Sequence, residues 1–70
     1  MHEKFKFLLS FGSSLKSARI AKGYSQEELG HRANLHRTYI GMVERGEKNI
    51  TLYNIYKISN ALDIKTKELL

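Results

Sequence analysis

The chain has 70 residues, enough for one domain with a small core. A core of this size rarely supplies more than about 3 to 5 kcal/mol of stability without further support. Cysteine is absent, which excludes disulfides and thiolate metal sites, and the three histidines are too scattered for a zinc site. Twelve Lys and Arg against seven Asp and Glu give a net charge of +5, which favours an acidic partner such as nucleic acid.

No apolar run approaches the ~20 residues that a membrane span requires, so no membrane association is expected. Residues 5–9 are apolar apart from Lys6, but the run is too short for a signal peptide and no small-residue cleavage site follows. We therefore expect a cytoplasmic protein.

Apolar residues recur at steps of three and four along nearly the whole chain, which is typical of α-helices. The first helix is outlined by Leu8, Phe11, Leu15 and Ala18. We expect it to end at Lys22-Gly23, a cation followed by a helix-terminating glycine. Residues 1–8 either extend this helix at its amino terminus or contact a partner.

The second helix is predicted to begin after Ser25. Its hydroxyl can accept from the main chain of Glu28 while the Glu28 carboxylate reaches back, which forms a capping box. Leu29 and Ala33 face inward, and Asn34 closes the helix because Asn tolerates the left-handed conformation.

Three further helices are expected. The third runs from about Arg37 to Arg45 and stops at Gly46, and the fourth begins after Thr51, a favourable N-cap. The fourth carries an apolar face of Leu52, Ile55, Ile58 and Leu62. Lys65 or Thr66 opens a short fifth helix that ends in Leu69-Leu70. We therefore predict an all-α fold, a compact five-helix bundle that forms a single domain over residues 1–70.

The junction between the second and third helices carries a specific pattern. Two helices that meet steeply through a turn of about three or four residues need a small residue where they cross. They also need a residue that adopts positive φ in the turn and an apolar residue that fills it. Gly30, Asn34 and Leu35 satisfy these requirements, and Ile40 and Val43 anchor the third helix to the core. The pattern predicts a helix-turn-helix from residue 26 to residue 45.

From Phe11 to Leu69 the chain resembles the Xre family of bacterial and phage regulators, which includes Cro and phage-repressor DNA-binding domains. Residues 36–40 and 43–50 are similar to controller proteins of restriction-modification systems. Gly30, where the family usually has alanine, and Asn34, where it usually has glycine, depart from the common pattern but are physically compatible with it. The interior glycine Gly41 is unusual, because it costs about 0.8 to 1 kcal/mol relative to alanine.

A recognition helix enters the major groove with its amino-terminal turns, so base contacts are expected there. Arg37 can pair bidentately with guanine O6 and N7. Thr38 can donate a hydrogen bond or touch a thymine methyl group, and Met42, one turn on, can make an apolar contact.

Contacts to the DNA backbone are expected at the flanks of the groove. The candidates are Ser25, Gln26, His36, Tyr39, Arg45, Lys48 and Asn49. Gln26 resembles the family's phosphate-binding glutamine, and the amino terminus of its helix adds N–H donors. His36 is first of all the N-cap position of the third helix. For each candidate, a solvated polar surface is the alternative interpretation.

Arg19 and Glu44 resemble a partly buried ion pair that locks the family's motif together. Such a pair adds little net stability, but removal of one partner strands a charge.

Two other classes of function compete with DNA binding. His31 and His36 could act as acid and base or bind a metal with Glu27, but no nucleophile or orienting group accompanies them. We therefore expect no enzyme activity, catalytic residue, metal, cofactor or small-molecule ligand. An antitoxin-like or adaptor protein, whose main contact is another protein, is the second alternative.

The last two predicted helices carry more apolar surface than so small a fold can bury. The residues concerned are Leu52, Tyr53, Tyr56, Ile64, Leu69 and Leu70. They either cover the core of a monomer or form a homodimer interface. We favour a homodimer, since two recognition helices about 34 Å apart bind a palindrome much more tightly than one.

The expected function is therefore sequence-specific regulation of transcription by a homodimer on a pseudo-palindromic operator, as in a restriction-modification controller. The expected partners are double-stranded DNA and a second copy of the chain, with RNA polymerase as a further candidate.

Overall fold

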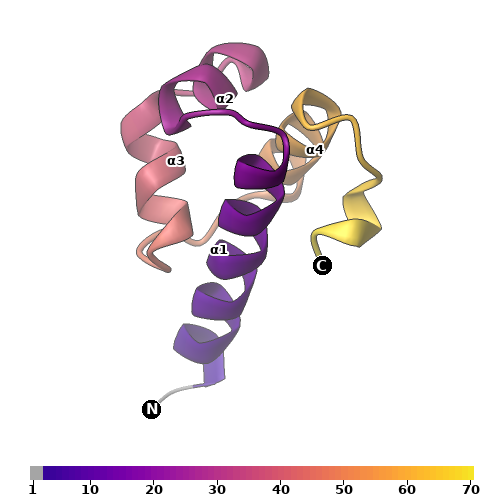
Figure 1. The fold of residues 1–70 in the computed structure, drawn as a ribbon. Coiled ribbons are helices and arrows are strands. Elements are labelled where there is room, and N and C mark those ends of the chain that lie inside the picture. Colours follow the sequence, from indigo (N-terminus) through magenta and orange to yellow (C-terminus); the bar gives the residue numbers. More distant parts are fainter. Residues whose placement is uncertain (1–2) are drawn as a thin grey trace.

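The computed structural model describes residues 3–70, and over that range its secondary structure consists of helices joined by loops, with no β-strand. Its elements are α1 (Glu3–Ala21), α2 (Gln26–Ala33), α3 (Arg37–Glu44), α4 (Leu52–Ala61) and the 3₁₀ turn η1 (Thr66–Glu68). In Figure 1, α2 lies across one end of α1 and α3 lies along one side of it, while α4 lies on the other side and packs against α2. The predicted all-α class is confirmed for the described residues.

The prediction of a fifth α-helix is wrong. The segment after α4 forms only three helical residues, closed by hydrogen bonds from Glu68 N to Lys65 O (2.9 Å) and from Leu69 N to Thr66 O (3.0 Å). These bonds span three residues rather than four, which is the 3₁₀ pattern. The side chain of Glu68 also accepts from the main-chain N–H of Lys65, which caps the start of this short turn.

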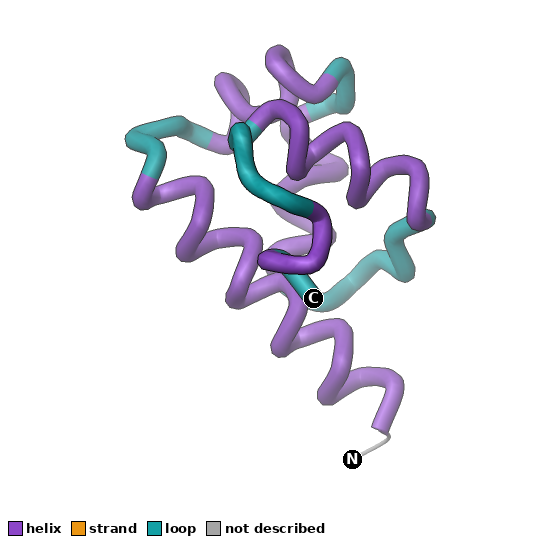
Figure 2. The backbone as a smooth tube through the Cα atoms, turned by 90° about the vertical axis from the view of Figure 1, so that its right-hand side faces the viewer, coloured by secondary structure: helices purple, strands orange, loops and turns teal. Residues whose placement is uncertain are grey.

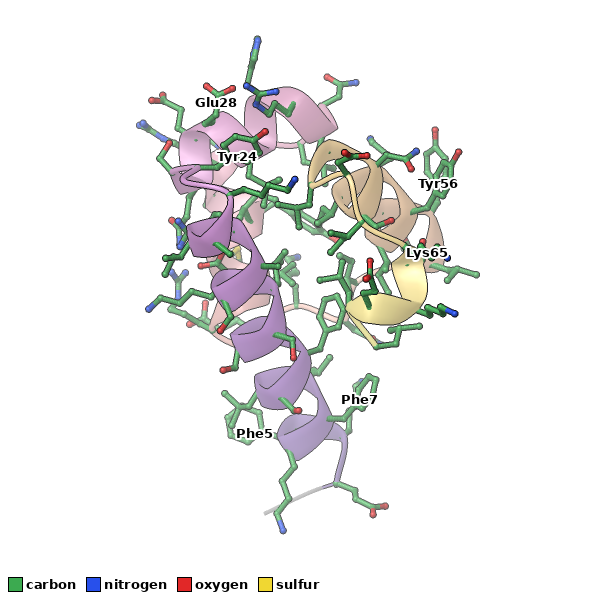
Figure 3. All side chains as sticks on the ribbon, turned by 45° about the vertical axis from the view of Figure 1, so that its right-hand side comes forward. Phe5, Phe7, Tyr24, Glu28, Tyr56 and Lys65 are labelled. Carbon is green, nitrogen blue, oxygen red and sulfur yellow. The ribbon has the colours of Figure 1, made fainter. Side chains whose placement is uncertain are left out.

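Helix α1 is longer than its core face requires. It begins at Glu3, so the extension expected for residues 1–8 is helical from residue 3 onward, while residues 1 and 2 lie outside the described range. Its first turns project beyond the other helices (Figure 2), and the aromatic side chains of Phe5 and Phe7 extend from them (Figure 3). No helix between residues 3 and 70 is long and apolar enough to cross a membrane.

A single apolar core lies between the four helices. Its buried members are Phe11, Leu15, Leu29, Ala33, Ile40, Val43, Ile55, Ile58, Leu62 and Leu69. Leu69 belongs to this core with only 2% of its surface exposed, because η1 turns the chain end back under α4. The expectation that Leu69 forms part of an intermolecular interface is therefore wrong.

Two glycines allow helices to touch through their main chains. A Cβ on Gly12 of α1 would lie 2.5 Å from the carbonyl oxygens of both Val43 and Glu44, at the end of α3. A Cβ on Gly30 of α2 would lie 2.5 Å from the carbonyl oxygen of Leu35 in the turn. Both distances are too short for any real side chain, so these glycines set how closely α3 approaches α1 and α2. The role predicted for Gly30 agrees with this contact, whereas Gly12 carries no signal in the sequence.

We expect Gly12→Ala to lower the free energy of unfolding by about 2 to 3 kcal/mol, because the added methyl group would meet main-chain oxygens that cannot rotate away. The measurement is urea unfolding followed by circular dichroism. Ser13→Ala, an exposed change on the same helix, is the control and should shift stability by less than about 0.5 kcal/mol. Equal stability of the two variants would contradict the close crossing.

Candidate nucleic-acid interface

Helix α2 begins directly after Ser25, as predicted. The Ser25 hydroxyl accepts from the main-chain N–H of Glu28 at 2.9 Å. The reciprocal half of the capping box is wrong, because the Glu28 carboxylate instead pairs with Arg32, one turn along the helix, at 2.7 Å. The amino terminus of α2 is therefore capped from one side only.

The turn between α2 and α3 is built as the sequence predicts. Asn34 adopts the left-handed conformation (φ 57°, ψ 46°), and the N–H of Leu35 donates to the carbonyl of Gly30 at 2.8 Å. His36 then caps α3, since its Nδ1 accepts from the N–H of Thr38 at 3.0 Å. These local bonds fix where the first turn of α3 begins.

One face of α3 points away from the core. Ile40 and Val43 are buried against the other helices. Because successive residues turn by about 100° on a helix, Thr38 and Met42 lie opposite these two anchors. Thr38 is exposed, Met42 is half-buried, and Arg37 extends into solvent beside α2. Thr38 and Met42 therefore share the side of α3 that is turned away from the core, and Arg37 is exposed at the amino-terminal end of the helix, beside α2.

A buried polar network holds α3 to the rest of the domain. Arg19 Nε donates to Glu44 Oε2 at 2.7 Å, Arg19 Nη2 donates to Glu44 Oε1 at 3.0 Å, and Arg19 Nη1 donates to the carbonyl of Tyr24 at 2.9 Å. The two charged side chains are only 10% and 3% exposed. The hydrogen bond to Glu44 is the main cause that raises the pKa of Arg19. The geometry agrees with the ion pair that the sequence resemblance implied.

Gln26 is part of the same network. Its Nε2 donates to Glu44 Oε1 at 3.0 Å, and its side chain lies over Gly41 of α3. A Cβ on Gly41 would come within 3.2 Å of Gln26 Oε1 and 3.1 Å of Arg45 Nη1. The interior glycine thus leaves room for two side chains that cross the recognition helix. Gln26 is also the first residue of α2, so its main-chain N–H has no acceptor within the helix.

Tyr39, expected near the DNA backbone, is half-buried between α3 and α4. Its hydroxyl oxygen accepts from Asn54 Nδ2 at 3.1 Å, and the N–H of Asn54 in turn donates to the Thr51 hydroxyl that caps α4. Asn54 carries no sequence signal, since its role depends on α4 lying beside α3. The phenol proton of Tyr39 remains free to donate to a partner.

The loop after α3 begins with an ion pair. Arg45 Nε and Nη2 donate to the two carboxylate oxygens of Glu47 at 2.8 and 3.3 Å. Their hydrogen bonding raises the pKa of Arg45 and lowers the pKa of Glu47, so both groups remain charged near neutral pH. Lys48 and Asn49 follow in the same loop and are exposed.

The residues proposed for a dimer interface divide into two groups. Four apolar or aromatic side chains are between 53% and 72% exposed: Leu52, Tyr53, Tyr56 and Leu70. The rings of Tyr53 and Tyr56 stack with their centroids 6.4 Å apart on the outer side of α4, where Figure 3 shows Tyr56 pointing away from the body. Ile64, in contrast, is half-buried against the core.

The metal cluster considered for His31, His36 and Glu27 does not form among the described residues. Within residues 3–70, no three His, Asp or Glu side chains gather closely enough to hold a metal ion. His36 is used as a helix cap, and His31 lies on the exposed side of α2.

We expect Glu44→Ala to lower the free energy of unfolding by about 3 to 5 kcal/mol, because the guanidinium of Arg19 would stay buried without its partner. Thermal and urea unfolding provide the measurement, with the surface change Glu47→Ala as the control. The double variant Arg19→Met with Glu44→Leu should lose less stability than Glu44→Ala, since no charge is then stranded. A Glu44→Ala protein that melts at the parent temperature would refute the structural role of the pair.

Comparison with known proteins identifies the family. The helix-turn-helix family HTH_3 matches residues 15–69. Control protein C.BamHI of Bacillus amyloliquefaciens is 48% identical over 63 residues, which cover 89% of this chain and 78% of that protein. Control protein C.SmaI of Serratia marcescens is 42% identical over 57 residues (81% and 68%). The crystal structure of the restriction-modification controller protein C.AhdI from Aeromonas hydrophila superposes with a TM-score of 0.95 at 46% identity, covering 99% of this chain and 100% of that one. The chain therefore belongs to the helix-turn-helix family that includes the restriction-modification controller proteins.

Proposed function

We propose that the chain is a DNA-binding regulator of transcription that controls a restriction-modification system as a homodimer. The observation that carries this proposal is the accessible surface of α3, where Arg37 and Thr38 are exposed in the first turn and Met42 is half-buried one turn on, while Ile40 and Val43 anchor the helix to the core. The sequence likeness to control proteins supports the biological role. Neither argument depends on a ligand or cofactor.

Base contacts come from the first turns of α3. The His36 cap and the left-handed turn at Asn34 set the start of this helix. A recognition helix enters the major groove from this end. Arg37 can then present its guanidinium to the O6 and N7 of a guanine, and Thr38 meets the neighbouring base pair.

Backbone contacts surround the base contacts. The first N–H groups of α2, at Gln26, have no acceptor inside the helix and carry the positive end of its dipole. The basic loop that follows the carboxyl end of α3 contains Arg45, Lys48 and Asn49. Such contacts fix the register on the duplex without reading its sequence.

The exposed side chains on α4 support a symmetric dimer. Leu52, Tyr53 and Tyr56 form a contiguous apolar surface that a single chain leaves in solvent. A two-fold axis through this surface would place two copies of α3 on the same side of a duplex, as a palindromic site requires.

In vitro selection of duplex DNA tests the proposal directly. A DNA-binding regulator should enrich a symmetric sequence whose half-sites lie about one helical turn apart. The absence of any enriched sequence would favour the antitoxin-like or adaptor alternative.

We expect Arg37→Ala to weaken binding to the selected site by about 1 to 3 kcal/mol and to relax the preference at one base pair per half-site. Lys48→Ala removes a charge from the flanking loop, so it should weaken binding to all duplexes equally. It should also reduce the slope of the log binding constant against log salt concentration by about one, because about one counterion fewer is released. Fluorescence anisotropy with selected and random duplexes at several salt concentrations distinguishes the two. Equal losses on both duplexes for Arg37→Ala would argue against its base contact.

We expect Tyr56→Glu to convert the dimer into a folded monomer, because the new charge would be buried at the interface. Ile20→Glu, on the exposed side of α1 and 58% exposed in the parent, is the matched control and should stay dimeric. Sedimentation equilibrium gives both masses. A parent protein that is monomeric at high micromolar concentration would contradict the dimer itself.

A further inference from the structure

Each arginine on the proposed DNA-binding surface is held by a carboxylate on that same surface. Arg37 Nη1 donates to Glu27 Oε2 at 3.1 Å, and Arg45 makes a bidentate pair with Glu47. We propose that Glu27 is a specificity-determining residue, which positions Arg37 for guanine and penalises contacts of the same surface with other DNA. This inference rests on the proposed function.

The pair with Glu27 leaves one edge of the Arg37 guanidinium free. Glu27 occupies Nη1, so Nε and Nη2 remain available as two parallel donors. This edge has the spacing that a bidentate contact with guanine O6 and N7 requires. Glu27 lies in the first turn of α2 and Arg37 in the first turn of α3, so the tie spans the two helices that form the motif.

In the free protein the pair is weak. The two side chains are 62% and 74% exposed, and an ion pair in solvent contributes little to stability. At a DNA interface much of the bulk water around the pair is displaced, and the same charges then interact more strongly. The effect of Glu27 should therefore be seen in binding rather than in folding.

The Glu27 carboxylate also repels the phosphates of the DNA backbone. On random DNA, the strongest contact open to Arg37 is the nearest phosphate. If Arg37 turns toward that phosphate, Glu27 loses its partner and is left beside a polyanion. At the correct guanine, Arg37 satisfies the base and Glu27 together. A repulsive group of this kind lowers affinity for wrong partners more than for the right one.

The neighbouring residue Glu28 provides a matched control. It carries the same charge in the same turn of α2, but its carboxylate pairs with Arg32 at 2.7 Å rather than with the recognition helix. Glu27→Gln and Glu28→Gln therefore change the net charge equally, and only Glu27→Gln removes the tie to Arg37.

The experiment measures dissociation constants for the selected duplex and for a random duplex of equal length. Glu27→Gln should tighten binding to the random duplex and lower the ratio of specific to random affinity by about fivefold or more, within the range of one guanine contact. Glu28→Gln should change both constants by the same factor. In an Arg37→Ala background, Glu27→Gln should no longer alter the ratio, because it acts through Arg37.

The outcomes separate the inference from the proposed function. If the parent chain prefers no sequence at all, the DNA-binding function fails and the inference fails with it. If the parent prefers its selected site and Glu27→Gln keeps the full ratio, only the role of Glu27 is overturned. A change in the ratio that persists in the Arg37→Ala background would likewise show that Glu27 does not act through Arg37.

Discussion

The recognition helix depends on one buried ion pair. Arg19 of α1 and Glu44 of α3 are joined by two hydrogen bonds, and Gln26 at the start of α2 adds a third donor to the same carboxylate. Within residues 3–70, every buried side-chain nitrogen and oxygen has a partner. Hydrogen bonds are directional, so a network in which every donor and acceptor is satisfied fixes the relative positions of its members. Apolar contacts, in contrast, allow helices to shift against one another. The network therefore gives α3 a defined orientation that a core of this size would otherwise not impose.

The local features of the motif could be predicted from sequence. The Ser25 and His36 caps, the left-handed turn at Asn34 and the end of α3 at Gly46 each depend on residues within a few positions along the chain. Turn and cap geometry follows from the chemistry of single residue types, such as an oxygen or nitrogen acceptor, or a glycine that tolerates positive φ.

Features that depend on distant neighbours could not be predicted. The close crossing at Gly12 requires the end of α3 to lie against α1, and the contact of Asn54 requires α4 to lie beside Tyr39. Leu69 is a further case. Its short segment carries no pattern that shows that η1 folds back under α4, and this fold-back is what buries Leu69. The Glu28 carboxylate pairs with Arg32 instead of reaching back to the start of its own helix. Both groups are close along the chain, so the local pattern alone does not decide between them.

The close crossings at Gly12 and Gly30 have an evolutionary consequence. Because main-chain atoms set the distances between these helices, the position of α3 owes nothing to the side chains that it presents to solvent. An exposed residue of α3 such as Thr38 can therefore be replaced without moving the helix. Such a scaffold separates the residues that fix the fold from those on the exposed surface of α3, so this surface can change while the fold stays intact.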